Sequence, residues 1–230
     1  HAFHRLLQSL TENQEARELI ERIVTDASLK VELSKHYFAD EAHTDEVKQL
    51  LHAMSNGGAI RTWRAKHRVG ATVVEHDFIC RFAKAMGQVT DELATTNNGP
   101  AGVQLITDNF PTKKARIADG SVQTRKRDAR LTWKSFLLQE AEMQGLLAKL
   151  QTAEEWGVRI GPPLHDCLFI ERSGDSQAIA SAMSANILAQ TGRRVSVALK
   201  PIEAPPEAEG PAMFQLKTQM DYFDEKDFCS

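Results

Sequence analysis

Apolar residues recur at the three- and four-residue spacing of a buried helix face through much of the first hundred positions. From Thr11, for example, Ala16, Leu19, Ile20 and Ile23 fall on one face, and acidic residues occupy the first turn, where the helix dipole favours them. The same spacing predicts further helices over residues 28–38, 44–54, 60–66 and 77–86.

The second half of the chain combines a basic, turn-rich stretch with a compact series of helices and strands. Residues 101–130 show no sustained period, so a long loop or insertion is predicted there. Strands are predicted over 69–74, 103–106, 164–170 and 195–199, and helices over 133–150 and 177–190.

These elements predict an α+β fold. The expected parts are a helical region over 1–100, the basic loop or insertion over 101–130, and a helix–strand–helix–strand unit over 131–200. A Pro/Glu-rich linker and a tail are expected over 201–230.

Composition narrows the class of protein. With 230 residues, of which 42% are hydrophobic and 26% charged, the chain can bury a core and is expected to be folded and soluble. No run approaches 18 apolar residues and no secretory signal is apparent, so no membrane span is expected. Three widely spaced cysteines form neither a disulfide framework nor a zinc pattern, which favours an intracellular, reducing environment.

Positive charge gathers in two clusters, although the formal net charge is −3. The clusters consist of Arg61, Arg64, Lys66 and Arg68, and of Lys113, Lys114, Arg116, Arg125, Lys126, Arg127 and Arg130. Each cluster is either a solvated surface or a contact with nucleic-acid phosphates, and the sequence leaves both interpretations open.

The stretch PPLHDCLFIE, residues 162–171, places His165 and Asp166 directly before a short apolar run typical of a buried strand. A carboxylate held at the end of a stiff strand is a suitable ligand for Mg²⁺, which prefers a few protein oxygens supplemented by water and phosphate. The alternative is a structural role, in which Asp166 caps a neighbouring loop.

A second candidate site lies on the helix predicted over 44–54. Lys48, His52 and Asn56 are four residues apart and share one helical face, where the lysine could hold a triphosphate. The alternative is an exposed helix face that ends in a cap at Gly57.

In order along the chain, these motifs resemble family A DNA polymerases and single-subunit phage-type RNA polymerases. In that group a fingers helix carries Arg-x3-Lys-x7-Tyr-Gly, and a palm hairpin carries His-Asp. Lys48 and Gly57 fall in register with the fingers motif, whereas Thr44 replaces the arginine and Asn56 replaces the tyrosine. Gln139 stands where a glutamine or histidine helix touches the primer–template.

The resemblance implies the helical fingers-like region and palm-like hairpin of a right-hand polymerase, here as a fragment of a divergent viral or mobile-element replication protein. It implies Mg²⁺ as cofactor, and as partners a template–primer, nucleoside triphosphates and other chains or the rest of a longer polypeptide. Asp166 would bind metal, and His165 would position the primer end. The remaining implied contacts are with nucleotide by Lys48, His52, Asn56 and Gly57, and with nucleic acid by Gln139, Arg61, Arg64, Arg125, Lys126 and Arg127.

One departure separates two hypotheses. Palm polymerases hold two metal ions with two aspartates, and Asp166 matches only one of these aspartates. The opening HAFHRLL resembles the segment that follows the second aspartate, which is therefore expected just before His1. The first hypothesis is an active polymerase. The second is a catalytically inactive, polymerase-like subunit that binds nucleic acid or assembles a complex, and a third, unrelated α+β domain remains open.

Overall fold

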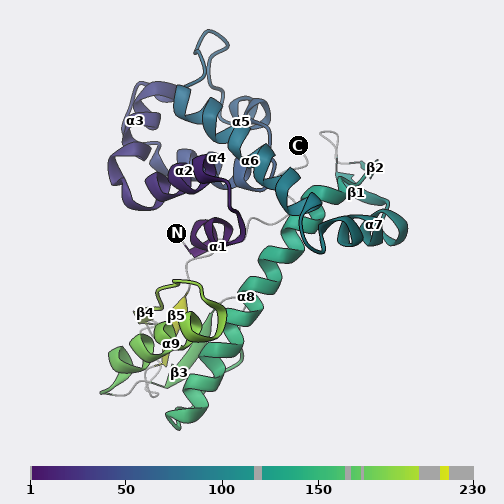
Figure 1. Cartoon of the computed structure of the whole chain (residues 1–230). Coiled ribbons are helices and arrows are strands. Elements are labelled where there is room, and N and C mark those ends of the chain that lie inside the picture. The colour runs from purple at the N-terminus through teal and green to yellow at the C-terminus, as the bar shows by residue number, and fades with distance from the viewer. Residues whose placement is uncertain (1, 117–120, 164–166, 172–173, 202–212, 218–230) are drawn as a thin grey trace. The chain divides into compact units, whose positions relative to one another are not determined.

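The computed structural model describes residues 2–116, 121–163, 167–171, 174–201 and 213–217 (Figure 1). The fold is α+β, and the described residues form two compact units. Unit 1 contains residues 2–9 and the described residues from 138 to 217, whereas unit 2 contains the described residues from 10 to 137. Helix α8 (Ala129–Glu155) begins in unit 2 and continues in unit 1.

Unit 2 is mainly helical, as the apolar pattern predicts. Its helices before α8 are α2 (Gln14–Thr25), α3 (Ala27–Phe38), α4 (Thr44–Ser55), α5 (Ile60–Lys66), α6 (Asp77–Thr95) and α7 (Gly99–Asn109). Helix α6 packs against α2, α4 and α7. The side chains of Ile20, Leu33, Leu50 and Phe82 have no exposed surface, so the stripes predicted for α2, α3, α4 and α6 meet in one core.

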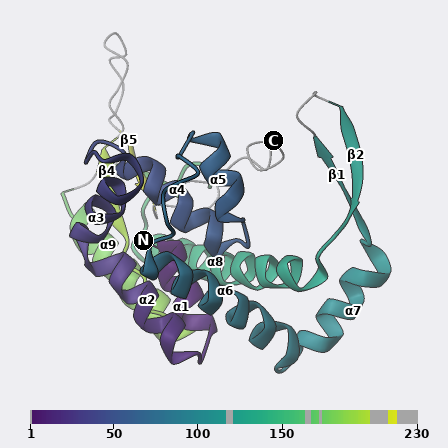
Figure 2. The same cartoon turned by 90° about the horizontal axis from the view of Figure 1, so that it is seen from above.

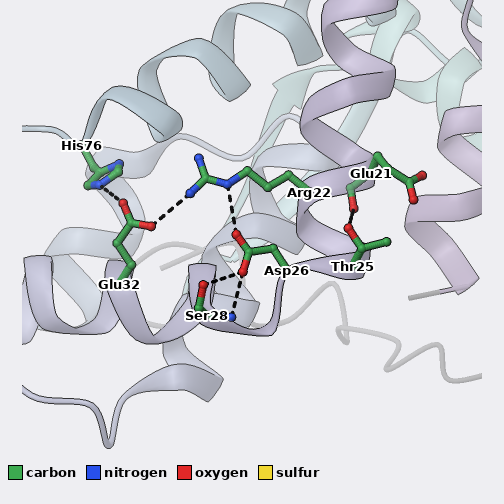
Figure 3. Close-up of polar contacts among 7 residues, drawn as sticks. All are labelled: Glu21, Arg22, Thr25, Asp26, Ser28, Glu32 and His76. Atoms are coloured by element: carbon green, nitrogen blue, oxygen red, sulfur yellow. Dashed lines mark hydrogen bonds and ion pairs between the residues drawn. The ribbon is translucent and has the colours of Figure 1, made fainter.

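A polar network joins the corner between α2 and α3 to the start of α6 (Figure 3). Arg22 pairs with Asp26 at 3.3 Å and with Glu32 at 3.1 Å. Glu32 also contacts Nε2 of His76 at 3.1 Å, while Nδ1 of His76 accepts a hydrogen bond from the Phe78 N–H. His76 is therefore the N-cap of α6 and a link to the preceding helices.

The strand predicted over 69–74 is wrong, because side chains occupy the backbone groups that a strand would pair. The guanidinium of Arg64 donates to the carbonyls of Gly70 at 2.6 Å and Val73 at 2.8 Å, and pairs with the Glu75 carboxylate. His36 contacts the Val74 carbonyl at 2.7 Å. The segment is a loop fastened to α3 and α5.

The prediction of a loop with one strand over 101–130 is wrong in two respects. Residues 103–106 lie within helix α7, because Gly102 lets that helix approach Trp133: a β-carbon at Gly102 would lie 2.4 Å from the ring. Strands β1 (Thr112–Arg116) and β2 (Val122–Lys126) then pair antiparallel, with Lys113 opposite Arg125. Figure 2 shows these strands side by side beyond the end of α7.

Unit 1 contains α1 (Ala2–Leu10), most of α8, and a three-stranded sheet with α9 (Ser176–Thr191). The sheet order is β3 (Leu168–Glu171), β5 (Met213–Lys217) and β4 (Ala198–Pro201), and both neighbouring pairs are antiparallel. Asn186 of α9 donates to the Ala148 carbonyl and to Thr152 Oγ1 of α8, both at 3.0 Å. Helix α9 is thereby fixed against α8.

Two predictions for unit 1 need correction. The strand predicted over 195–199 begins at Ala198, although Val195 and Val197 are buried before it. The tail prediction is wrong for residues 213–217, which form the central strand of the sheet, and the linker predicted over 202–212 lies outside the described residues. Within the described ranges, every helix is too short or too polar to cross a bilayer.

Candidate functional site

The segment that carries His165 and Asp166 is bracketed by paired backbone in unit 1. The Gly161 N–H donates to the Phe169 carbonyl at 2.9 Å, and the Glu171 N–H donates to the Arg159 carbonyl at 3.0 Å. Between them, Ile160 and Ile170 form an antiparallel bridge. Residues 159–161 and 169–171 thus form the two arms of a hairpin.

The hairpin is anchored by the two residues directly before its second arm. Cys167 and Leu168 are buried, with exposed fractions of 3% and 0%. His165 and Asp166 themselves lie outside the described residues. The role of Asp166 as a Mg²⁺ ligand therefore stays a prediction. Among the described residues, no three acidic, histidine or cysteine side chains are grouped as metal ligands.

The predicted polar strip on α4 gains a second lysine from α3. Lys48 and His52 are half-buried and Asn56 is exposed. Burial, and then the neighbouring charge of Lys48, lowers the pKa of Lys30, while Asp45 acts in the opposite direction. Because α3 packs against α4, Lys30 lies on a helix next to the one that carries Lys48. Lys30 could not be assigned to this site from sequence, since only packing of α3 on α4 brings it there.

Gly57 ends α4 in a way that only glycine allows without strain. Its φ is +82°, in the left-handed region, and its N–H donates to the Met54 carbonyl at 3.0 Å. An added β-carbon would lie 2.5 Å from the Leu131 side chain at the start of α8. Asn56, directly before it, donates its side-chain amide to the His52 carbonyl at 3.1 Å. Both residues thus have structural roles, and their predicted contacts with nucleotide stay predictions.

A pocket of about 470 Å³ lies beside Gly57 within unit 2. Met54, Met86 and Leu131 supply apolar surface, and α5 contributes Arg61. Further charged lining residues are Asp91, Asp128 and Arg130, of which Arg130 pairs with Asp91 at 2.7 Å. The structure therefore brings together Gly57 and Arg61, two predicted site residues, in a cleft that sequence did not indicate.

Lys134 of α8 is a buried ammonium that sequence analysis missed. Its side chain is 1% exposed, and Nζ donates to the Ser55 carbonyl at 2.7 Å and to Thr90 Oγ1 at 3.1 Å. Burial lowers its pKa to about 8, although the charge of Asp128 acts in the opposite direction. Thr90 also lines the pocket. The available signal was its spacing, since Lys134 shares one face of α8 with the buried residues Leu138 and Ala141.

The remaining predicted residues lie on helix α5, on helix α8 and on strand β2. Arg64 is held by the loop at 70–75, whereas Arg61 is exposed. Gln139 is exposed on the part of α8 that belongs to unit 1. Arg125 and Lys126 are exposed on β2.

Arg127, directly after β2, is half-buried, and its backbone N–H donates to the Pro111 carbonyl at 2.9 Å. Its side-chain Nε is buried without a hydrogen-bond partner among the described residues. Such a donor is costly unless an acceptor reaches it.

Comparisons of the chain with protein-family models, with curated proteins and with solved structures gave no match. The similarity to family A polymerases stays a prediction from the motifs.

Proposed function

We propose that the chain is the fingers–palm portion of a template-directed nucleotidyltransferase that uses Mg²⁺. The observation that carries this proposal is the hairpin of unit 1, whose paired arms at 159–161 and 169–171 bracket the His-Asp dipeptide. In the polymerases that the chain resembles, the same dipeptide lies on a palm hairpin. In this chain, helix α8 precedes the hairpin and helix α9 follows it.

The proposed roles follow from the side-chain chemistry. Asp166 supplies a carboxylate oxygen to the metal, and His165 orients the end of the primer. When bound, Mg²⁺ would activate the 3′-hydroxyl and stabilise the charge that develops on the transferred phosphate. The Lys48 ammonium attracts the triphosphate.

The direct test is extension of a primer by one nucleotide, with the complete encoded protein, so that a second carboxylate N-terminal to His1 is included if it is encoded. Asp166→Asn keeps the size of the side chain and removes its charge. Loss of a metal ligand that stabilises the transition state by several kcal/mol is expected to reduce the rate about 10³-fold. The matched control is Asp175→Asn, an exposed aspartate of the same unit whose side chain makes no capping hydrogen bond to α9. Equal extension by wild type and Asp166→Asn would end the proposal.

A second candidate function is a polymerase-like subunit that binds nucleic acid without catalysis. The observation that favours it is the structural use of Asn56 and Gly57 at the end of α4, where the related motif has Tyr-Gly. This candidate predicts that the complete protein binds primer–template but adds no nucleotide in the presence of Mg²⁺. Extension that depends on Asp166 would exclude it.

A further inference from the structure

Strands β1 and β2 form a ribbon, here called the basic ribbon, that buries no face. Every strand residue whose side chain the structure describes is exposed: Thr112, Lys113, Lys114, Val122, Gln123, Thr124, Arg125 and Lys126. Figure 2 shows the ribbon beyond the end of α7. Burial of apolar side chains therefore contributes little to its stability.

Charge is arranged on both faces of the basic ribbon. Lys113 lies directly opposite Arg125, and these two share one face because side chains alternate along a strand. Lys114, opposite Thr124, and Lys126, opposite Thr112, lie on the other face. Like charges directly opposite each other destabilise an antiparallel pair.

An isolated two-stranded hairpin is at best marginally stable, even without such repulsion. Residues 111–127 carry six basic residues and one acidic residue, so the segment offers its own cations almost no counter-charge. An anionic partner that reaches both faces at once would remove the repulsion. A flat anionic surface reaches only one face.

We propose that the basic ribbon enters the major groove of a B-form DNA duplex, where phosphates of both strands flank it. That groove is about 12 Å wide and admits a two-stranded ribbon. Five strand residues span about 17 Å, close to the length of five base pairs. Neither strand carries an aromatic residue on which the bases of a single strand could stack.

This inference shares with the proposed function only the expectation of nucleic acid, and it requires no catalysis. The test is the affinity of the complete protein for a fluorescent 20-base-pair DNA duplex between 50 and 200 mM salt. If four ribbon cations contact phosphates, the slope of log affinity against log salt concentration is about −3.6. The affinity for the duplex should then fall about 150-fold between 50 and 200 mM salt.

Lys113→Gln/Arg125→Gln removes the two cations of one face. The slope should then be about −1.8, so that affinity falls only about 12-fold over the same range. Lys113→Arg/Arg125→Lys keeps the charge and should behave as wild type. The control Lys84→Gln/Arg194→Gln removes the same total charge from exposed positions outside the ribbon and should retain the full slope.

Three further ligands test the binding mode: the matching single strand, a duplex RNA, and vesicles of phosphatidylserine and phosphatidylcholine. The proposal expects the DNA duplex to bind most tightly, because the major groove of RNA is too narrow and deep for the ribbon. Equal or tighter binding of any of the three would overturn it, as would an unchanged slope in Lys113→Gln/Arg125→Gln. Asp166→Asn should bind the duplex as wild type does, so loss of extension and loss of ribbon binding are separate results.

Discussion

Lys134 provides a quantitative test of the packing between α4, α6 and the start of α8. Replacement by methionine keeps a similar volume and removes the ammonium. Thr90 would keep a partner, since its hydroxyl donates to the Met86 carbonyl at 2.9 Å, whereas the Ser55 carbonyl would lose the Lys134 donor. At a single pH, the loss of this hydrogen bond and the removal of the buried charge change the free energy of unfolding in opposite directions. Its dependence on pH isolates the ammonium.

The sign of that dependence follows from the direction of the pKa change. The ordinary lysine pKa is 10.5, and burial lowers that of Lys134 to about 8 in the folded protein. Between these values the unfolded chain binds more protons than the folded one, so the free energy of unfolding rises with pH. The full effect is about 3 kcal/mol, of which about 1.3 kcal/mol falls between pH 7 and pH 9.

The assay is urea unfolding at pH 7 and pH 9, followed by tryptophan fluorescence in a Trp156→Phe background. Trp63 and Trp133 then report on unit 2 alone. From pH 7 to pH 9, wild type should gain about 1.3 kcal/mol more stability than Lys134→Met. Lys84→Met, at an exposed position of α6, should keep the wild-type dependence.

If wild type and Lys134→Met respond equally to pH over this range, Lys134 is not a buried ammonium in the folded protein. The packing of α8 against α4 and α6 described above would then be incorrect.

Two further substitutions test the structural roles of predicted site residues. Gly57→Ala should destabilise unit 2 by about 1–3 kcal/mol in the same urea assay, because φ is +82° and the new β-carbon meets Leu131. The control is Gly87→Ala in helix α6, where an added β-carbon would have no neighbouring atom within 4 Å, and this change should be neutral or slightly stabilising. Equal effects of the two substitutions would refute the reasoning. Arg64→Met should release the loop at 69–75 and speed its amide hydrogen exchange, whereas Arg61→Met should not, and unchanged exchange in Arg64→Met would contradict the clamp.

Much of the helical structure could be predicted from sequence, because long amphipathic segments specify both their length and their buried face. The helix predicted from Thr11 is confirmed as α2. The strands predicted over 69–74 and 103–106 were wrong, because tertiary contacts outweighed the β-propensity of these residues. Val74 is 78% exposed in a loop held by Arg64, and the run at 103–106 became helical because α7 packs on Trp133 through Gly102.

The candidate site shows the same division. The spacing of Lys48, His52 and Asn56 could be extracted from the sequence, because it depends only on helix period. The burial of Lys134 depends on the packing of α8 against α4 and α6, which are distant from it in sequence. Strand β5 was missed since its five residues follow a Pro/Glu-rich segment, and its pairing with β3 and β4 is set by partners elsewhere in the chain.

The central claim is tested most directly by incorporation of a single nucleotide on four primer–templates that differ only in the next template base. With the complete encoded protein and Mg²⁺, the account predicts that the added nucleotide is the complement in each case and that Asp166→Asn slows incorporation about 10³-fold. Incorporation that ignores the template base, or that proceeds equally in wild type and Asp166→Asn, would contradict it.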